Sequence, residues 1–417
     1  MVVGLVATFL SLRDDASSGP DGALPSSTSV PTSADANSPQ ERVIRLQAKI
    51  TQDPDDWESL AALGQAYVGQ AAVNGDPSLY PRAEESLDRS LEVQPDANLP
   101  ASIAQGSLAA ARHDFDLSLE WAEKASAIAP DDANVQAVMG DALLELGRYD
   151  EAFAAFQRMI DLRPDLAAYS RISYARELQG DVDGAVTAMA AAESSASSGS
   201  DAAFAAFQLG ELEWHRGRTD TAVNHYRRAA GLDPVAVRAE AALARAAYYA
   251  GDEDDAIDQY RSVVGRLPLP QYVSELAAIY TVTDQPDRAE DQLRLLAAQR
   301  KLFADAGVAV DADLAVINAD NGSDVEASLD AMKAEWEVRK SVFVADALAW
   351  LLHLNGRSEE ALSYSDEALR LGTRNALFHF HRSEIHQALG DDEAASADLA
   401  TAEEINPNFS ILYSGRP

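Results

Sequence analysis

Small residues return along most of this chain at a nearly constant interval. A glycine, or once an aspartate, is followed five residues later by an alanine, and the next such pair comes about 34 residues further on. This interval predicts a stack of two-helix units, in which each unit covers its apolar face with its neighbours. The alanines of the series are Ala152, Ala185, Ala222, Ala256, Ala289, Ala327, Ala361 and Ala395.

Each residue type in this period has a physical reason. The glycine is expected to end the first helix of a unit, because it readily takes the left-handed backbone that a helix end requires. The alanine is expected where the two helices of a unit approach closely, so that a larger side chain would push them apart. A proline such as Pro164 cannot continue a helix and fits the start of the next unit. The residues five positions before the alanines are Gly147, Gly180, Gly217, Gly251, Asp284, Gly322, Gly356 and Gly390.

Residues 133–164 resemble a tetratricopeptide repeat at nearly every signature position. Residues 63–95 and 209–234 carry most of the same signature, and ten units are counted from Trp57 to Pro407. The resemblance implies an all-α fold, a right-handed α-solenoid of about ten tetratricopeptide-like helix-turn-helix repeats. The array as a whole is also similar to a group of bacterial tetratricopeptide proteins, and this likeness bears on fold and not on activity. The signature residues within 133–164 are Met139, Gly140, Leu143, Gly147, Tyr149, Ala152, Phe156 and Pro164.

The repeats divide the chain into a solenoid and the segments that flank it. A Ser-x-x-Glu capping box begins the first helix, and a run rich in serine, proline and threonine precedes it. The predicted parts are an apolar segment at 1–15, a flexible linker at 16–37, an N-terminal capping helix at 38–56, repeat units one to six at 57–268, degenerate units seven and eight at 269–341, and units nine and ten with a C-terminal tail at 342–417.

The first twelve residues are apolar throughout. They are too few for a spanning helix, which needs about 20 residues, and they lack the basic residues that begin a secretory signal. They are interpreted as the remnant of a membrane anchor or signal, because an exposed apolar end would favour aggregation in the cytoplasm. A membrane tether through residues 1–12, with the solenoid outside the cytoplasm, is therefore predicted, and a cytoplasmic location is the alternative.

Charge narrows the class of partner. Acidic residues number 68 against 33 basic ones, and the formal net charge is −35. Binding to nucleic acid requires a dense basic face, so a nucleic-acid partner is not expected, whereas a protein or peptide partner, including a cationic one, is compatible with this charge. The chain has no cysteine, which excludes disulfides, thiolate metal sites and cysteine nucleophiles.

Candidate catalytic and metal-binding residues are few. His379, His381 and His386 are two, five and seven residues apart, whereas two metal ligands on one helix stand three or four apart, so these histidines are expected to pack in the core. Residues 320–324 resemble a calcium loop only faintly and predict a turn. No nucleophile elbow, zinc-protease motif or phosphate loop occurs. The chain is therefore predicted to be no enzyme and to hold no cofactor or metal.

The resemblance also implies where a partner would bind. In tetratricopeptide proteins the first helix of each unit lines a concave groove, and its second, fifth, ninth and twelfth positions point into it. Aromatic side chains and arginine carry most of the binding energy at protein interfaces. The alternative is that these side chains pack on neighbouring units or on a terminal extension. The partner-binding residues predicted in this way are Tyr174, Phe207, Glu211, Trp214, Arg238, Arg245, Tyr248, Phe343, Trp350, His353 and Phe380.

These patterns predict a non-catalytic protein-interaction scaffold, tethered at the cell envelope, that holds a partner's peptide or helix in the groove. The alternative is a soluble cytoplasmic adaptor or regulator. A more remote alternative is an enzyme whose site lies on the groove.

Overall fold

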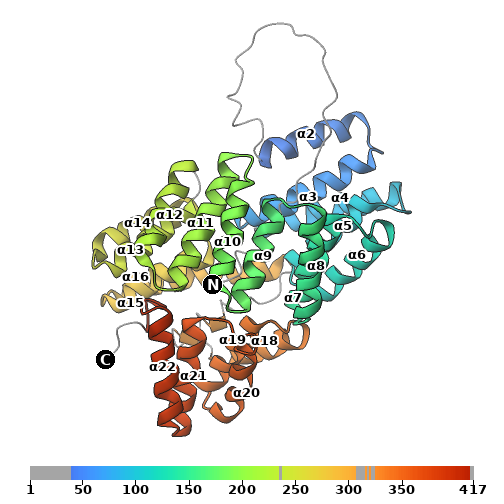
Figure 1. Cartoon of the computed structure of the whole chain (residues 1–417). Helices are drawn as coiled ribbons and strands as arrows, with labels where there is room; N and C mark the ends of the chain where they lie inside the picture. The colour runs from blue at the N-terminus through green and yellow to red at the C-terminus, as the bar shows by residue number, and fades with distance from the viewer. Residues whose placement is uncertain (1–38, 234–236, 307–314, 317–318, 321–324, 414–417) are drawn as a thin grey trace. The chain divides into compact units, whose positions relative to one another are not determined.

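The regular structure of this chain is helical, and no strand occurs among the described residues (Figure 1). The predicted all-α fold is therefore confirmed. The apolar segment predicted at 1–15 and the linker predicted at 16–37 lie outside the described residues. A computed structural model describes residues 39–413 apart from 234–236, 307–314, 317–318 and 321–324.

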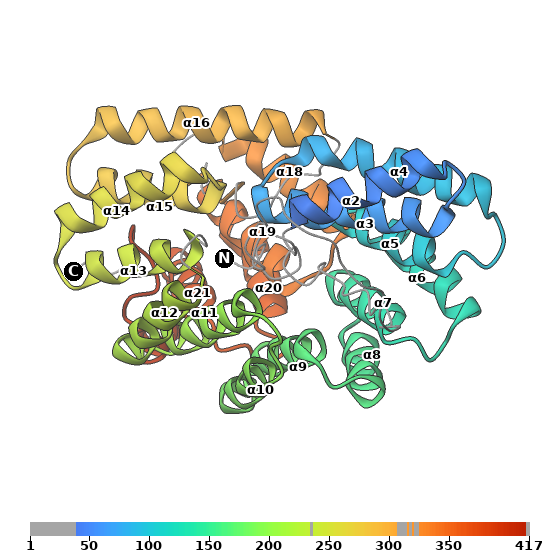
Figure 2. The same ribbon diagram turned by 90° about the horizontal axis from the view of Figure 1, so that it is seen from above.

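The helices follow one another in pairs joined by short turns, after a single helix at the start (Figure 1). The longest described helix, α16, has 20 residues, and Figure 2 shows it alongside α15. The helices are α2 (Pro39–Gln52), α3 (Trp57–Asn74), α4 (Tyr80–Val93), α5 (Leu99–Ala111), α6 (Phe115–Ile128), α7 (Ala133–Glu145), α8 (Tyr149–Leu162), α9 (Leu166–Leu178), α10 (Val182–Ser194), α11 (Gly199–His215), α12 (Thr219–Leu232), α13 (Val237–Tyr249), α14 (Glu253–Arg266), α15 (Pro270–Val282), α16 (Pro286–Asp305), α18 (Val325–Val338), α19 (Val342–Leu354), α20 (Ser358–Ala368), α21 (Ala376–Leu389) and α22 (Asp392–Ile405).

Glycines on the first helix of a pair allow a large side chain of the second helix to pack closely. Gly64 of α3 lies beneath Leu87 of α4, and Gly210 of α11 lies beneath Tyr226 of α12. A Cβ atom at either glycine would collide with the facing side chain. Since glycine has no side chain of its own, the two helices of the pair can approach to the distance that buries the facing residue.

The turns between paired helices use the predicted left-handed backbone. The φ angle is 72° at Gly147, 74° at Gly180 and 55° at Asp284. Glycine takes this conformation without a steric penalty, and aspartate is among the few other residues that tolerate it. The predicted role of these turn residues is confirmed, while Gly322 lies outside the described residues.

The alanines expected at close helix contacts are mostly buried. The prediction is wrong at Ala327, which is exposed. In α18 the buried stripe runs through Ser328, Leu329 and Met332, and Ala327 lies off that stripe because the apolar residues that orient the helix are displaced by one position. The fully buried alanines, each 0% exposed, are Ala152, Ala185, Ala222, Ala256 and Ala361.

The chain divides into two compact units, the first ending at Met139 and the second running from Gly140 onward. Within the second unit, the start of α19 and the residues before α21 contact α8 and α9 (Figure 1). The Val342 amide donates a hydrogen bond to the Tyr149 hydroxyl at 2.8 Å. The Thr373 hydroxyl donates to the Leu178 carbonyl at 2.6 Å. Repeats far apart in the sequence are thus joined within this unit, beyond the stacking of sequence neighbours.

Candidate partner-binding site

The predicted partner-binding residues lie on α9, α11, α13, α19 and α21, the first helices of their pairs. These side chains differ in their degree of burial. The buried ones pack inside the array, whereas a partner could contact the half-buried ones. The buried ones are Tyr174, Glu211, Trp214, Arg245, Trp350 and Phe380, and the half-buried ones are Phe207, Arg238, Tyr248, Phe343 and His353.

The first group of these residues joins α11 to α13 through Arg245. One Nη atom of Arg245 lies 2.5 Å from the Glu211 carboxylate, and its guanidinium lies 4.5 Å from the centre of the Trp214 ring. The Tyr226 hydroxyl donates to the same carboxylate at 2.6 Å. Burial disfavours the charge of Glu211, but Arg245, His215 and the hydrogen bond from Tyr226 together outweigh it and lower the pKa of Glu211. Glu211 and Arg245 therefore form a buried ion pair inside the array, and neither is exposed for contact with a partner.

Two residues that the sequence analysis missed complete this network. Glu275 of α15 lies 3.8 Å from Arg245, and the Tyr260 hydroxyl donates to Glu275 at 2.9 Å. Burial raises the pKa of Glu275 and also that of Tyr260, which keeps the tyrosine a hydrogen-bond donor. The repeat period indicates the Glu211–Arg245 pair, because adjacent repeats place such residues side by side, but Glu275 stands 30 residues beyond Arg245 and off that period.

Aromatic rings extend this first group toward the surface. Trp214 packs against Tyr249 with ring centres 5.5 Å apart, and Tyr249 meets Tyr248 edge-on at 5.2 Å. Phe207 lies 6.0 Å from Tyr226. Phe207 thus packs on the buried ring of Tyr226, and Tyr248 packs on the half-buried Tyr249, which in turn packs on the buried Trp214. Such packing limits the side-chain entropy that is lost on binding.

The second group surrounds Trp350 on α19. Its ring stacks on the His381 ring at 4.2 Å, and the His353 ring lies at 5.2 Å. The indole N–H donates to the Asp320 carboxylate at 2.6 Å. Burial, together with the charge of His381, lowers the pKa of His353 and so favours its neutral form. The structure therefore brings Trp350 and His353 together, as the sequence predicted for two residues of one helix face.

The C-terminal segment lies against this second group. Tyr413 stacks on Phe380 with ring centres 4.9 Å apart, and Phe409 lies 5.1 Å from the same ring. The Tyr413 hydroxyl donates to Asp320 at 2.6 Å. Ile411 is 9% exposed and belongs to an apolar cluster with residues of α13–α15. The terminal extension that the sequence analysis weighed as an alternative thus covers part of the predicted face.

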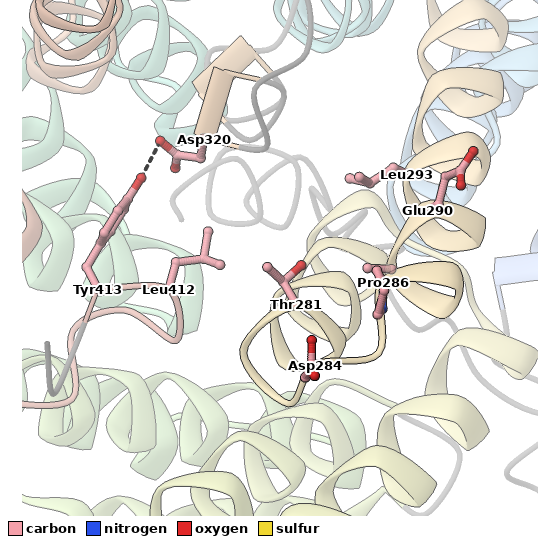
Figure 3. Close-up of a pocket in the computed structure, with 9 residues that line it drawn as sticks. Thr281, Asp284, Pro286, Glu290, Leu293, Asp320, Leu412 and Tyr413 are labelled. Atoms are coloured by element: carbon pink, nitrogen blue, oxygen red, sulfur yellow. Dashed lines mark hydrogen bonds between the residues drawn. The ribbon is translucent and has the colours of Figure 1, made fainter.

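A cavity of about 340 Å³ adjoins the end of this segment. Figure 3 shows Leu412 and Tyr413 on one side of the cavity, and Thr281 of α15 and Leu293 of α16 on the other. The Tyr413 hydroxyl is hydrogen-bonded to Asp320. Burial raises the pKa of Asp320, although the hydrogen bonds from Tyr413 and Trp350 oppose this. The cavity leaves room beside the segment that its own side chains do not fill.

Three predicted residues belong to neither group: Tyr174, Phe343 and Arg238, which is half-buried near the start of α13. Tyr174 is fully enclosed, and burial together with the Glu145 carboxylate raises the pKa of its hydroxyl far above the usual value. Phe343 meets Phe378 edge-on with ring centres 5.4 Å apart. Tyr174 is therefore part of the packing between repeats, while the half-buried Phe343 remains accessible beside α21.

The three histidines of α21 each face a carboxylate. His379 lies 2.9 Å from Asp398, and His381, 1% exposed, lies 2.9 Å from Asp346. His386 lies 3.9 Å from Asp398. Among the described residues no set of three acidic, histidine or cysteine side chains is placed to hold a metal ion. Nor does any described helix have the length and apolar content needed to cross a membrane.

Helix pairs that return every 34 residues or so define the class of this protein as an α-solenoid repeat protein. Residues 133–166 match the family model of the tetratricopeptide repeat, and residues 167–268 match that of the bacterial transcriptional activator domain. The resemblance to multi-repeat tetratricopeptide proteins is thereby confirmed. No curated protein matches the chain.

Solved structures are similar to this chain at low identity. The crystal structure of MamA is 19% identical and covers 39% of this chain and 93% of its own, with a TM-score of 0.32. YrrB, described as a TPR protein with an unusual peptide-binding site, is 18% identical over 46% of this chain and 95% of its own, with a TM-score of 0.30. A human IFIT1 dimer with m7Gppp-AAAA is 16% identical over 81% and 78%, with a TM-score of 0.47. Similarity this weak carries no statement about function.

Proposed function

We propose that this chain is a non-catalytic scaffold that binds a peptide or helix of a partner protein on the first-helix face of its second unit. That face carries aromatic rings and arginine, the residue types that dominate the binding energy of protein interfaces. Nucleic acid is not expected as a partner, because a net charge of −35 repels phosphates.

The observation that carries the proposal is a segment of the chain already seated on this face. Residues 406–413 leave α22 without regular helix and place Phe409 and Tyr413 against Phe380. Ile411 enters the apolar cluster of α13–α15. A face that accommodates one peptide segment in this way has the apolar surface and the hydrogen-bonding groups to accommodate another.

A second function is supported by the match of residues 167–268 to the bacterial transcriptional activator domain. On this proposal the chain is a soluble adaptor or regulator. It would affect transcription through a protein partner, because the acidic charge opposes direct contact with DNA. The scaffold and the regulator differ mainly in location, so the tether decides between them.

The tether is part of the scaffold proposal and depends on residues 1–12, which are apolar. We expect the full chain to sediment with membranes and a variant without residues 1–15 to remain in the supernatant. If both sediment, or neither does, the tether is wrong and the soluble adaptor is favoured.

Partner binding is tested with immobilised full chain, using Tyr248→Ala and His353→Ala as variants of the proposed face. The control is Leu162→Ala, which alters a side chain 42% exposed at the end of α8, a second helix of its pair. We expect each of the two face variants to capture at least tenfold less partner than the wild type does. The reason is that an aromatic side chain at the centre of an interface contributes about 2 kcal/mol or more to binding. Equal capture by all four proteins would contradict binding at this face.

A further inference from the structure

We propose that the segment Asn406–Tyr413 is an internal ligand of the partner site and that the partner displaces it. The partner segment would then carry the same chemistry: an aromatic residue, two aliphatic residues two and three positions later, and a final aromatic residue with a hydroxyl group. This inference rests on the proposed function, because it concerns which peptide the face accepts and what regulates its access.

The segment contacts side chains that the repeat pattern places on the binding face. Tyr413 meets Trp350 edge-on at 5.9 Å and stacks on Phe380. Phe409 packs against the same Phe380. Both Trp350 and Phe380 are predicted partner-binding residues, so the chain's own tail occupies the place that the repeat assigns to a ligand.

A specific polar contact fixes the end of the segment. The Tyr413 hydroxyl and the Trp350 indole both donate to the same oxygen of Asp320, each at 2.6 Å. A phenylalanine at the last position would leave this half-buried carboxylate with one fewer donor, which costs more than the loss of a fully exposed hydrogen bond. The face therefore selects a terminal tyrosine over a phenylalanine.

The middle of the segment fills an apolar depression made by other repeats. Ile411 packs in the cluster that contains Tyr272 and Leu276 of α15, and Leu412 packs against the same cluster. The start of the segment passes the turn between α11 and α12, where Asn406 lies close to Gly217. One short segment thus joins an apolar cluster with residues of α13–α15 and contacts α19 and α21, which is the path a bound peptide would follow across several repeats.

The segment does not fill the binding face completely, so a ligand that fills it better would bind more tightly. Phe409, Leu412 and Tyr413 are only half-buried, and the cavity of about 340 Å³ beside Leu412 and Tyr413 is unfilled. A tethered segment acts at an effective concentration on the order of millimolar, so it lowers the apparent affinity of a competing peptide without abolishing binding. A partner with a bulkier side chain at the cavity would overcome this competition.

The test uses a fluorescent peptide of residues 406–413 as the probe and the full chain as the protein. The variant Phe409→Ser with Tyr413→Ala weakens docking of the tail, and Leu399→Ala, a residue 40% exposed on α22, is the matched control. We expect the double variant to bind the peptide at least tenfold more tightly than the wild type or the control. Equal binding by all three proteins, or no binding by a double variant of unchanged circular dichroism, overturns the proposal.

A second measurement does not depend on the double variant folding. In wild-type protein, a saturating excess of the peptide should speed amide hydrogen exchange within residues 406–413 of the chain, because the peptide takes their place. A peptide with phenylalanine for the final tyrosine should be less effective by about tenfold. Unchanged exchange with the peptide bound overturns the displacement.

The two proposals fail in different ways. If the probe does not compete but partner capture still depends on Tyr248 and His353, the tail is a fixed cap and the scaffold function stands. If the probe displaces the tail but no captured partner depends on those residues, the internal ligand stands and the scaffold function fails.

Discussion

Turn glycines in this protein have two separate functions. All of those named here take a positive φ, which an L-residue adopts with difficulty. Gly147 and Gly180 also lie against the backbone of distant repeats, since an added Cβ would meet the Lys340 carbonyl at 2.6 Å in one case and the Gly372 carbonyl in the other. At Gly251 the space around the added atom is open. The sequence pattern predicts the first function equally for all, whereas the second depends on which backbone arrives from elsewhere.

Substitution by alanine separates the two functions. We expect Gly251→Ala to lower the free energy of unfolding by about 1 kcal/mol, the penalty of the left-handed backbone. Gly180→Ala should cost roughly 1–3 kcal/mol more, because the methyl group also displaces the Gly372 backbone. Chemical denaturation of both variants measures the difference. Equal losses would show that the contact between repeats has no influence on stability.

Charged residues also divide into contacts that the repeat period predicts and contacts that only the tertiary structure reveals. Glu211 and Arg245 stand at matching positions of adjacent repeats, and their contact at 2.5 Å could be inferred from the period alone. Their partner Glu275 could not, because it stands 30 residues beyond Arg245 and off the period. The predicted binding role of Glu211 and Arg245 changes once both are seen to be buried and paired.

At the scale of elements, the last helix pair is joined by a polar contact as well as by apolar packing. Asp398 of α22 accepts a hydrogen bond from Arg382 of α21 at 2.8 Å and lies 2.9 Å from His379. Burial disfavours its charge, yet these two neighbours lower the pKa of Asp398 to about 2. A carboxylate with a depressed pKa in the folded state stabilises the fold at neutral pH and stops doing so in acid.

The sign of this linkage gives a pH-dependent prediction. In an unfolded chain the pKa of an aspartate is about 3.9, so the contribution of Asp398 is complete above that pH and declines as the pH falls toward 2. We expect Asp398→Asn to cost about 1–2 kcal/mol at pH 7 and to differ less from the wild type near pH 2. Urea unfolding at pH 7, 4 and 2.5 tests it, with the exposed Glu393→Gln on α22 as control. If Asp398→Asn lowered the free energy of unfolding equally at all three pH values, the depressed pKa of Asp398 would be contradicted.

Element boundaries were largely predictable from sequence, and the exceptions have a local cause. The period places a turn at Gly147 and at Asp284, and both residues have the expected backbone. It fails at Ala327 because the buried stripe of α18 runs through Leu329 and Met332, two larger apolar residues. Where the apolar residues and the repeat period disagree, burial of the larger side chains decides the helix rotation.

At the scale of the second unit as a whole, a buried charge bridge joins repeats far apart in sequence. Arg339 lies 2.7 Å from Glu145 of α7 and 3.6 Å from Glu335 of α18. All three side chains are at most 8% exposed. Burial raises the pKa of Glu335, although Arg339 opposes this. Two carboxylates at one place depend on a single guanidinium, so the closure of the unit depends on Arg339.

Removal of that guanidinium should open the contact. We expect Arg339→Met to cost about 3–5 kcal/mol, because Glu145 and Glu335 would remain buried without a counter-charge. Adding Glu145→Gln to that variant should restore part of the stability. A double-mutant cycle by denaturation measures the coupling, and hydrogen exchange at residues 340–373 reports the opening directly. Strictly additive effects of the two substitutions would show that the bridge does not hold the unit closed.

The sequence alone determined the kind of local structure: paired helices, their turns and the positions that face one another in neighbouring repeats. It could do so because these contacts join residues at most one repeat apart, and the period of the small residues records them. Only the tertiary structure decided that Val342 reaches Tyr149, that Thr373 reaches Leu178, and that the tail covers Trp350 and Phe380. Those contacts depend on how small rotations between successive repeats add up, a quantity that no single repeat encodes.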